Sequence, residues 1–223
     1  VFRQMFKKEV GIDLIMPEGP QKKSYCENVK ANWSEKKEEK KEESILDEKL
    51  QVKSSLKKCI GENNKNWSNC LGTYISGNRY KYTGEWKDGK QDGNGAEIWR
   101  DGKKYIGQFK NDMRNGQGIL TLPNGTKYVG SFKNGKQHGQ GTLVMNSKIK
   151  YSGQFMENQI QKGTAEYPNG TKYVGEFKFN KPNGVGTLEY SSGGKFTGNF
   201  VDGFEFGEGL CIKPNGTSIK CVM

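Results

Sequence analysis

Glycines and lysines in this chain stand at spacings close to those of a phosphate-binding loop. Residues 130–137 read Gly-Ser-Phe-Lys-Asn-Gly-Lys-Gln, and such a run could place backbone N–H groups and a lysine around a phosphate. However, Gln137 stands where a magnesium-binding Ser or Thr is needed, and no helical pattern follows. The same near-match recurs at 84–90, so it reflects an internal repeat. We therefore predict no nucleotide and no other cofactor here.

The only histidine gives little support for catalysis. His138 occupies a position that holds Asp92, Asn115 and Asn183 in other copies of the repeat, which indicates an exposed turn residue and not a base. No Ser/His/Asp or Cys/His set can be assembled in a sheet without a cleft. We therefore predict no catalytic residue, no metal ligand and no small-molecule substrate.

The cysteines form two pairs and one remainder. Cys59 and Cys70 straddle one expected hairpin turn, and Cys211 and Cys221 straddle another at the opposite end, so each pair is within reach of a disulfide. Disulfides would imply an oxidising compartment, whereas the alternative is reduced thiols in a cytosolic protein. Zinc is disfavoured because no close Cys-x-x-Cys pair is present. Cys26 is left over in either case.

Basic residues recur with the repeat and could bind an anionic surface. The net charge is +11, and most of the excess lies after residue 58. The alternative is a solvated edge without a binding role. Lipid head groups would gain about 1 kcal/mol per lysine, while nucleic acid is not expected because the aromatic rings are used in packing. The candidate binding residues are Lys87, Lys104, Lys127, Lys133, Lys150, Lys172 and Lys195.

Six tandem units of about 23 residues must position these side chains. Self-similarity at a fixed period indicates an array in which each unit completes its neighbour's core. Alternation along a strand places Tyr82, Gly84 and Trp86 on one face and Thr83 and Glu85 on the other. Because Gly84 has no side chain, we expect it to leave a slot that a ring from a neighbouring repeat fills.

The predicted core repeats in every unit as an aromatic residue, a glycine and a second aromatic residue. The second strand of each unit adds apolar residues at alternate positions, with Glu97 as an exception in the first unit. The predicted core residues are Tyr82, Gly84, Trp86, Tyr105, Gly107, Phe109, Tyr128, Gly130, Phe132, Tyr151, Gly153, Phe155, Tyr173, Gly175, Phe177, Phe196, Gly198 and Phe200.

The full pattern is Tyr-x-Gly-x-Phe/Trp-Lys-x-Gly-Lys-x-x-Gly-x-Gly-Thr, best seen at 128–142 and 173–187. It resembles the MORN (membrane occupation and recognition nexus) repeat over residues 82–218. The fourth unit departs most, because Gln161 replaces the first glycine of the Gly-x-Gly pair. The resemblance implies arrays used for membrane association, for dimerisation, or as appendages to enzymes.

We predict an all-β fold with one elongated antiparallel sheet of tandem β-hairpins. Residues 59–81 resemble a seventh, degenerate copy that caps the array, residues 82–218 hold the six repeats, and 219–223 form a final strand or tail. Residues 1–58 are a charged lead-in. Within it, residues 34–57 could form an amphipathic helix or stay disordered, and the sequence leaves both open.

The expected function is that of a non-catalytic scaffold that binds a protein partner or a second copy of itself. Two alternatives stay open: peripheral binding of anionic phospholipid through the lysines, and a regulatory subunit of a separate enzyme. No apolar run is long enough to span a membrane. The chain starts at Val1, so a leader and export remain possible.

Overall fold

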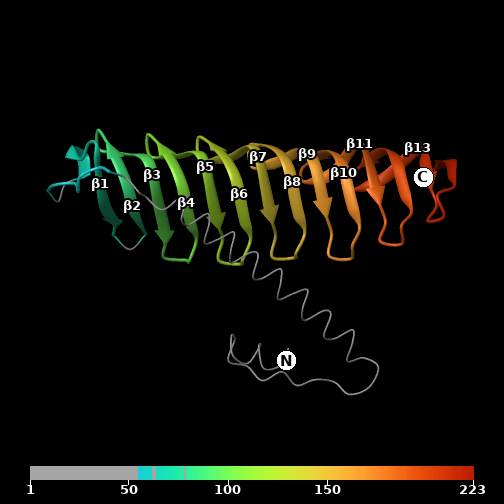
Figure 1. The fold of residues 1–223 in the computed structure, drawn as a ribbon, viewed down its shortest axis with the longest axis horizontal. Coiled ribbons are helices and arrows are strands. Elements are labelled where there is room, and N and C mark those ends of the chain that lie inside the picture. Colours follow the sequence, from blue (N-terminus) through green and yellow to red (C-terminus); the bar gives the residue numbers. More distant parts are fainter. Residues whose placement is uncertain (1–54, 62–63, 78) are drawn as a thin grey trace, which may run out of the picture. The chain divides into compact units, whose positions relative to one another are not determined.

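The computed structural model describes residues 55–61, 64–77 and 79–223, which form one antiparallel sheet (Figure 1). Each strand is hydrogen-bonded to the next one in the chain, so the sheet is a continuous meander. The predicted all-β repeat sheet is confirmed, whereas the suggested helix at 34–57 lies almost wholly outside the described residues. The fourteen strands are β1 Cys70–Ser76, β2 Tyr80–Lys87, β3 Lys90–Trp99, β4 Lys104–Lys110, β5 Met113–Thr121, β6 Lys127–Lys133, β7 Lys136–Val144, β8 Lys150–Met156, β9 Gln159–Glu166, β10 Lys172–Lys178, β11 Lys181–Glu189, β12 Lys195–Val201, β13 Phe204–Ile212 and β14 Ser218–Val222.

The segment expected as a capping repeat contributes one strand and not a hairpin. β1 pairs with β2, but the residues ahead of β1 include a short 3-10 helix, η1 (Asn64–Asn66), instead of a strand. Residues 57–59, which precede η1, cover the outer edge of β1 with their backbone. The N–H of Leu71 donates to the carbonyl of Lys57, and the N–H of Cys59 donates to the carbonyl of Leu71, each at 2.9 Å. This contact protects an edge strand that could otherwise pair with other chains.

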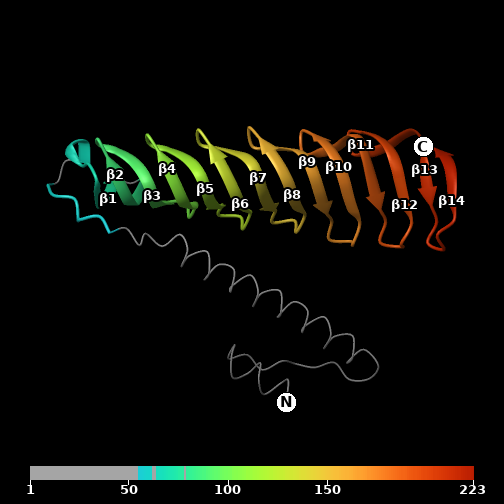
Figure 2. The same cartoon turned by 45° about the horizontal axis from the view of Figure 1, so that its top comes forward.

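Two kinds of turn alternate along the chain and lie on opposite edges of the sheet (Figures 1 and 2). On the first, which we call the tight-turn edge, both central residues of each turn have positive φ, as in type I′ hairpins. The second, the wide-turn edge, carries the longer connections, such as the one in which the N–H of Leu122 donates to the carbonyl of Thr126. The tight turns are Asp88-Gly89, Asn111-Asp112, Asn134-Gly135, Glu157-Asn158, Phe179-Asn180 and Asp202-Gly203.

Hydrogen bonds also join successive tight turns to one another. The N–H of Gly135, for example, donates to the carbonyl of Arg114 in the preceding unit at 2.9 Å. Where the second central residue is Asp or Asn, its side-chain oxygen also accepts an N–H from the preceding unit. These side-chain contacts are Asp112 to Gln91 at 2.8 Å, Asn158 to Gln137 at 2.9 Å and Asn180 to Ile160 at 3.1 Å.

Each hairpin that closes on the tight-turn edge contains a β-bulge. In the first one, Gly84 faces Gly95 and Trp86 faces Gln91, so β3 holds two residues more than β2 between the matched pairs. Gly93 lies inside this bulge with φ of +101°, a conformation that other residues rarely adopt. Such a bulge bends the strand and increases its twist.

The bend lets the opening tyrosines of the first, second, third and fifth units lie over their own pairs of glycines. A Cβ on Gly95 would stand 2.5 Å from the hydroxyl oxygen of Tyr82 and 2.6 Å from its ring. The same hydroxyl donates to the carbonyl of Glu85 at 2.9 Å, only three residues further along the chain. The expectation that a ring from a neighbouring repeat fills the slot at Gly84 was therefore wrong, because Tyr82 of the same unit already fills it.

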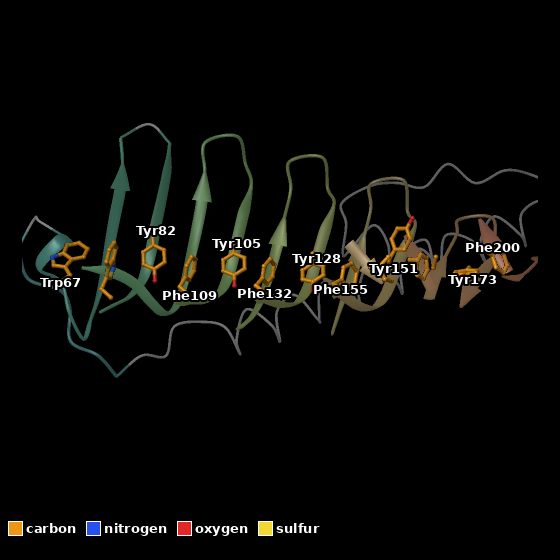
Figure 3. Close-up of a cluster of buried hydrophobic side chains, with 14 of the residues drawn as sticks. Trp67, Tyr82, Tyr105, Phe109, Tyr128, Phe132, Tyr151, Phe155, Tyr173 and Phe200 are labelled. Atoms are coloured by element: carbon orange, nitrogen blue, oxygen red, sulfur yellow. The ribbon is translucent and has the colours of Figure 1, made fainter. Parts of the chain in front are cut away.

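Neighbouring repeats meet instead through edge-to-face contacts between their rings, which Figure 3 shows in sequence. Tyr105 contacts Phe109 of its own unit at 5.1 Å and Phe132 of the next unit at 5.0 Å. Pairs of this kind contribute about 0.5–1.5 kcal/mol beyond the burial of their area. The rings of Tyr82, Tyr105 and Tyr173 have no exposed surface, although the strands of the described residues form a single sheet without a second layer. Bent strands and interlocked rings therefore supply the core that a second layer would otherwise provide.

The fourth unit interrupts this arrangement. It is one residue shorter, and its bulge contains one extra residue where the other units have two, so Gln161 needs no positive φ. Figure 3 shows the hydroxyl of Tyr151 pointing to the opposite side from those of Tyr82 and Tyr105. Among the described residues, Tyr151 forms a ring contact with Phe177 at 6.0 Å but none with Phe155 of its own unit. The stack of rings thus has one discontinuity.

Candidate interaction surfaces

The candidate lysines lie on the face of the sheet opposite the aromatic core, but they do not form one ladder. Lys87 and Lys133 end β2 and β6 at the tight-turn edge. Lys104 and Lys150 begin β4 and β8 at the wide-turn edge, six residues from the far ends of those strands. At about 3.3 Å per residue the two edges are roughly 20 Å apart. The predicted single ladder is therefore two separate rows.

The lysines of the wide-turn edge occupy one cross-strand row. Register places Lys104 opposite Thr121, Thr121 opposite Lys127, and Lys127 opposite Val144, and the pattern continues along the sheet. Successive lysines are thus two strands, or about 10 Å, apart. The row consists of Lys81, Lys104, Lys127, Lys150, Lys172 and Lys195.

The electrostatic environment of this row changes halfway along the sheet. In the C-terminal half, Glu166 and Glu189 occupy the positions between the lysines. Glu166 lies 3.5 Å from Lys150 and Glu189 lies 3.3 Å from Lys195. From β2 to β8 the positions between the lysines are uncharged, and the only acidic residue of that stretch of the edge is Asp101. The basic residues there are Arg79, Lys81, Arg100, Lys103, Lys104, Lys127, Lys148 and Lys150.

Lysines at the tight-turn edge stand close to carboxylates. Lys87 faces Lys90 across the first tight turn, and Lys136 forms an ion pair with Glu157 of the following turn. A shallow hollow between the first two turns is lined by Lys87 and Lys90 together with Asp88 and Asp92. Positive and negative side chains alternate along this edge. We therefore expect an anion to bind more weakly here than at the wide-turn edge.

Both predicted cysteine pairs are joined in the structure. The Sγ atoms of Cys59 and Cys70 are 2.12 Å apart, and those of Cys211 and Cys221 are 2.08 Å apart. The first disulfide links the segment ahead of η1 to β1, and the second links β13 to β14. Each one packs against the last rings of the aromatic core, where a further repeat would otherwise lie. Cys26 lies outside the described residues.

Among the residues that the structure describes, Glu97 is the one acidic side chain buried in the aromatic face. It takes the place of a leucine between Tyr82 and Tyr105, and only 8% of it is exposed. Burial raises the pKa of Glu97, while the nearby Arg114 guanidinium and a hydrogen bond from Gln91 lower it. The side chain therefore belongs to the packed interior of the first unit.

Burial also changes the acidity of the core tyrosines. It raises the pKa of Tyr128 and that of Tyr173 to about 12 each. Their hydroxyls donate to the carbonyls of Ser131 and Glu176 inside their own strands. These groups keep their protons and hold the strands in their bent form.

The residues considered for catalysis are not gathered into a site. His138 lies inside β7 and is half-buried, so its assignment to an exposed turn was wrong. Residues 130–137 run from β6 through a tight turn into β7. Across 55–61, 64–77 and 79–223 no group of three or more His, Cys, Asp or Glu side chains is placed to hold a metal ion. In those same ranges no helix is long and apolar enough to cross a membrane.

Sequence reasoning missed an exposed apolar surface at the last repeat. Val201, Phe204 and Phe206 lie on the same face as the lysines and are exposed to solvent. The equivalent residues of the first unit are Lys87, Lys90 and a third polar residue, Asp92. Comparing the six units position by position would have revealed this change from polar to apolar. Exposed apolar patches of this kind mark interaction sites in soluble proteins.

Comparisons with known proteins agree with the repeat structure. The family model of the MORN repeat matches residues 82–104, 105–127, 128–147, 173–195 and 196–218, which together make up half of the chain. The gap between the third and fourth matches, residues 148–172, contains the whole of the irregular fourth unit. No curated protein matches the chain.

Among solved structures, the chain is similar to one described as the SAS-4 (dCPAP) TCP domain in complex with a proline-rich motif of Ana2 (dSTIL) of Drosophila melanogaster. The identity is 14%, the match covers 69% of this chain and 90% of that chain, and the TM-score is 0.34. A likeness at this level carries no argument about function.

Proposed function

Because this chain belongs to the MORN repeat family, whose tandem units build repeat scaffolds, we propose that it is a non-catalytic scaffold that binds a protein partner or a second copy of itself. The observation that carries this proposal is the exposed apolar surface of Val201, Phe204 and Phe206 at the end of the array. Binding at such a surface removes apolar area from water, which contributes about 25 cal/mol per Å². The core rings are already packed against one another and cannot contact a partner, whereas this surface is exposed.

The proposal is tested by comparing complexes of the full chain with those of two matched variants. Phe204→Ser alters the exposed surface of the sixth unit, and Met113→Ser alters the equivalent exposed position of the second unit. We expect Phe204→Ser to lose the chain's complexes, whether with itself or with another protein, and Met113→Ser to keep them. Analytical ultracentrifugation and affinity capture followed by mass spectrometry measure the two kinds of complex. Complexes that Phe204→Ser leaves unchanged would contradict the proposal.

A second candidate function is peripheral binding of anionic phospholipid, and the charge of the wide-turn edge favours it. From β2 to β7 this edge presents a row of lysines, Lys81, Lys104 and Lys127, whose cross-strand neighbours are uncharged. Their spacing of about 10 Å would let several head groups be contacted at once, at about 1 kcal/mol per basic residue. The region from β9 to β12 is a weaker candidate, because Glu166 and Glu189 neutralise it.

Two double variants with the same change in net charge separate these halves. Lys81→Glu/Lys104→Glu reverses charge where the neighbours are uncharged, and Lys172→Glu/Lys195→Glu reverses it where glutamates already stand. In co-sedimentation with anionic vesicles at low salt, we expect the first variant to lose binding and the second to keep most of it. Equal losses would point to net charge alone. No binding of the wild-type chain at any salt concentration would exclude this second function.

A further inference from the structure

The first unit departs from the packing pattern of the aromatic face at one buried position. Glu97 stands there, whereas each of the other five units has an apolar residue, such as Leu120 in the second. Burying a carboxylate where an apolar side chain would fit is unfavourable unless the charge is compensated. Natural proteins break their own packing rules in this way mainly at functional sites. The surroundings of Glu97 are therefore a candidate binding site.

A second buried polar side chain, Gln91, lies beside Glu97 and is only 3% exposed. It contributes a side-chain hydrogen bond to Glu97 and another to Tyr80, so it lies between these two residues. Among the residues that the structure describes, the Oε1 atom of Gln91 is buried and accepts no hydrogen bond. A buried acceptor without a donor is costly, and an N–H group of a ligand would supply the donor. Gln91 and Glu97 together thus favour a ligand that carries N–H groups and a positive charge.

Two half-buried aromatic rings border this pair of polar residues. Tyr80 and Trp99 face each other across β2 and β3, with ring centroids 6.1 Å apart and ring planes inclined at 39°. Trp99 follows Glu97 by two positions on the same face of β3, a separation of about 7 Å along the strand. Aromatic faces attract cations, Trp most strongly, and a nearby carboxylate adds to that attraction. The rings and Glu97 therefore favour the same class of ligand.

One cation of the chain already lies against these rings. The Nζ atom of Lys103 is 4.0 Å from the centroid of the Trp99 ring, and the Lys103 carbonyl accepts the N–H of Trp99. Lys103 is half-buried, whereas Lys104 beside it is exposed on the opposite face. The position of Lys103 holds uncharged residues in the later units, namely Thr126, Ile149, Thr171 and Gly194. An ammonium group therefore fits against Trp99.

The other basic group near Glu97 is held elsewhere. The guanidinium carbon of Arg114 lies 5.6 Å from the centroid of the Tyr105 ring and 5.8 Å from that of Phe132. These rings belong to the second and third units, so Arg114 stacks beyond Glu97 and not on Trp99. A ligand cation at Trp99 has to displace Lys103 alone.

We propose that the first unit binds an alkylammonium group, which replaces the ammonium of Lys103 against Trp99 and Tyr80, next to the buried Glu97. Lys103 is then a built-in competitor that covers the Trp99 ring while no ligand is bound. Such a group is supplied by a lysine side chain of another protein or by a free amine. The site lies on the aromatic face of the first unit, whereas the apolar surface at Phe204 lies on the opposite face of the last, so the inference goes beyond the scaffold function.

NMR titration of the isotope-labelled full chain with Nα-acetyl-lysine methylamide tests the proposal. The indole N–H signal that disappears in Trp99→Phe belongs to Trp99. We expect the lysine derivative to shift this signal and to leave that of the buried Trp67 in place. The norleucine derivative, which has the same chain without the ammonium, should cause no shift. n-Butylamine is the free-amine probe: tighter binding of the lysine derivative supports a protein as the source, and tighter binding of n-butylamine supports a free amine.

Three variants test the roles of the charged residues. Glu97→Gln removes the charge at nearly constant size and should weaken binding about tenfold. Lys103→Met uncovers the Trp99 ring and should strengthen binding about threefold. Lys104→Met makes the same change in net charge on the opposite face and should leave the affinity unchanged, so it separates competition at the ring from a general effect of charge. Circular dichroism verifies the fold of each variant.

Three outcomes would overturn the proposal. The first is a Trp99 signal that neither amine shifts, in the wild-type chain and in Lys103→Met alike. The second is an equal shift with the norleucine derivative, which would indicate apolar contact only. The third is an affinity of Lys103→Met no higher than that of Lys104→Met. None of these outcomes affects the complexes compared with Phe204→Ser, so failure of this site is distinguishable from failure of the scaffold function.

Discussion

Substitution of Gly118 by alanine tests the close packing of tyrosine on glycine in the core. A Cβ at this position would lie 2.5 Å from the hydroxyl oxygen of Tyr105 and 2.6 Å from two ring carbons. The ring cannot withdraw freely, because it is fully buried between Phe109 and Phe132 and its hydroxyl donates to the carbonyl of Gln108. Loss of the hydrogen bond and weakening of the two ring contacts give an expected destabilisation of about 2–4 kcal/mol.

Urea denaturation followed by circular dichroism measures this effect. With the urea dependence usual for small proteins, the expected loss lowers the unfolding midpoint by roughly 1–2 M. Gly194→Ala is the matched control, since its Cβ would meet the nearest atom at 3.4 Å and its backbone has no positive φ. If Gly118→Ala and Gly194→Ala unfold at midpoints closer than about 0.3 M, the close packing of Tyr105 on Gly118 does not contribute to the stability of the core.

Three further predictions concern the end disulfide, the buried carboxyl group and the tight-turn contacts. Cys211→Ser/Cys221→Ser should destabilise the last unit by about 2–3 kcal/mol, so that limited proteolysis cuts first near the C-terminal end; an unchanged cleavage pattern would argue against a stapling role. Burial raises the pKa of Glu97, so the native state binds its proton more tightly and the wild-type chain loses stability as pH rises through that pKa. Glu97→Leu should therefore be more stable than wild type at pH 7, and its stability should change less from pH 4 to pH 7 in thermal melts. A less stable variant would show that the polar contacts of Glu97 outweigh the cost of burying it. Asp112→Ala removes the acceptor of the Gln91 N–H and should cost about 1–2 kcal/mol in urea denaturation, whereas Asp112→Asn should cost much less; equal losses would mean that this hydrogen bond contributes little.

The strands and the ring positions could be predicted because the pattern that indicates them recurs in all six units. The spacing of the opening glycines gave the hairpin length, and Asp88-Gly89 and Asn134-Gly135 marked tight turns that the φ angles bear out. The placement of Tyr82 over its own glycines could not be foreseen. It depends on a bulge that bends the strand, and simple alternation along the strand does not contain such a bend.

The surfaces were less predictable because they depend on register between strands. Sequence spacing groups Lys87 with Lys104, but the strand direction sends them to opposite edges of the sheet. The neutralising positions of Glu166 and Glu189 emerge only when the strands are paired. The apolar change at Phe204 was visible in the sequence, where it replaces the lysine that follows the tight turn in the repeat pattern, but only the strand register places it beside Val201.

The shortened fourth unit has a consequence for how the array comes apart. Each repeat is stabilised mainly by its immediate neighbours, so the cooperativity of unfolding depends on every junction along the array. Inside the fourth unit the contact between Tyr151 and Phe155 is missing, although the ring contacts of this unit with both of its neighbours are present. We therefore expect the array to unfold as two cooperative blocks that meet within this unit. Under load or in denaturant the blocks separate at this weak point, and each retains a disulfide at its outer end.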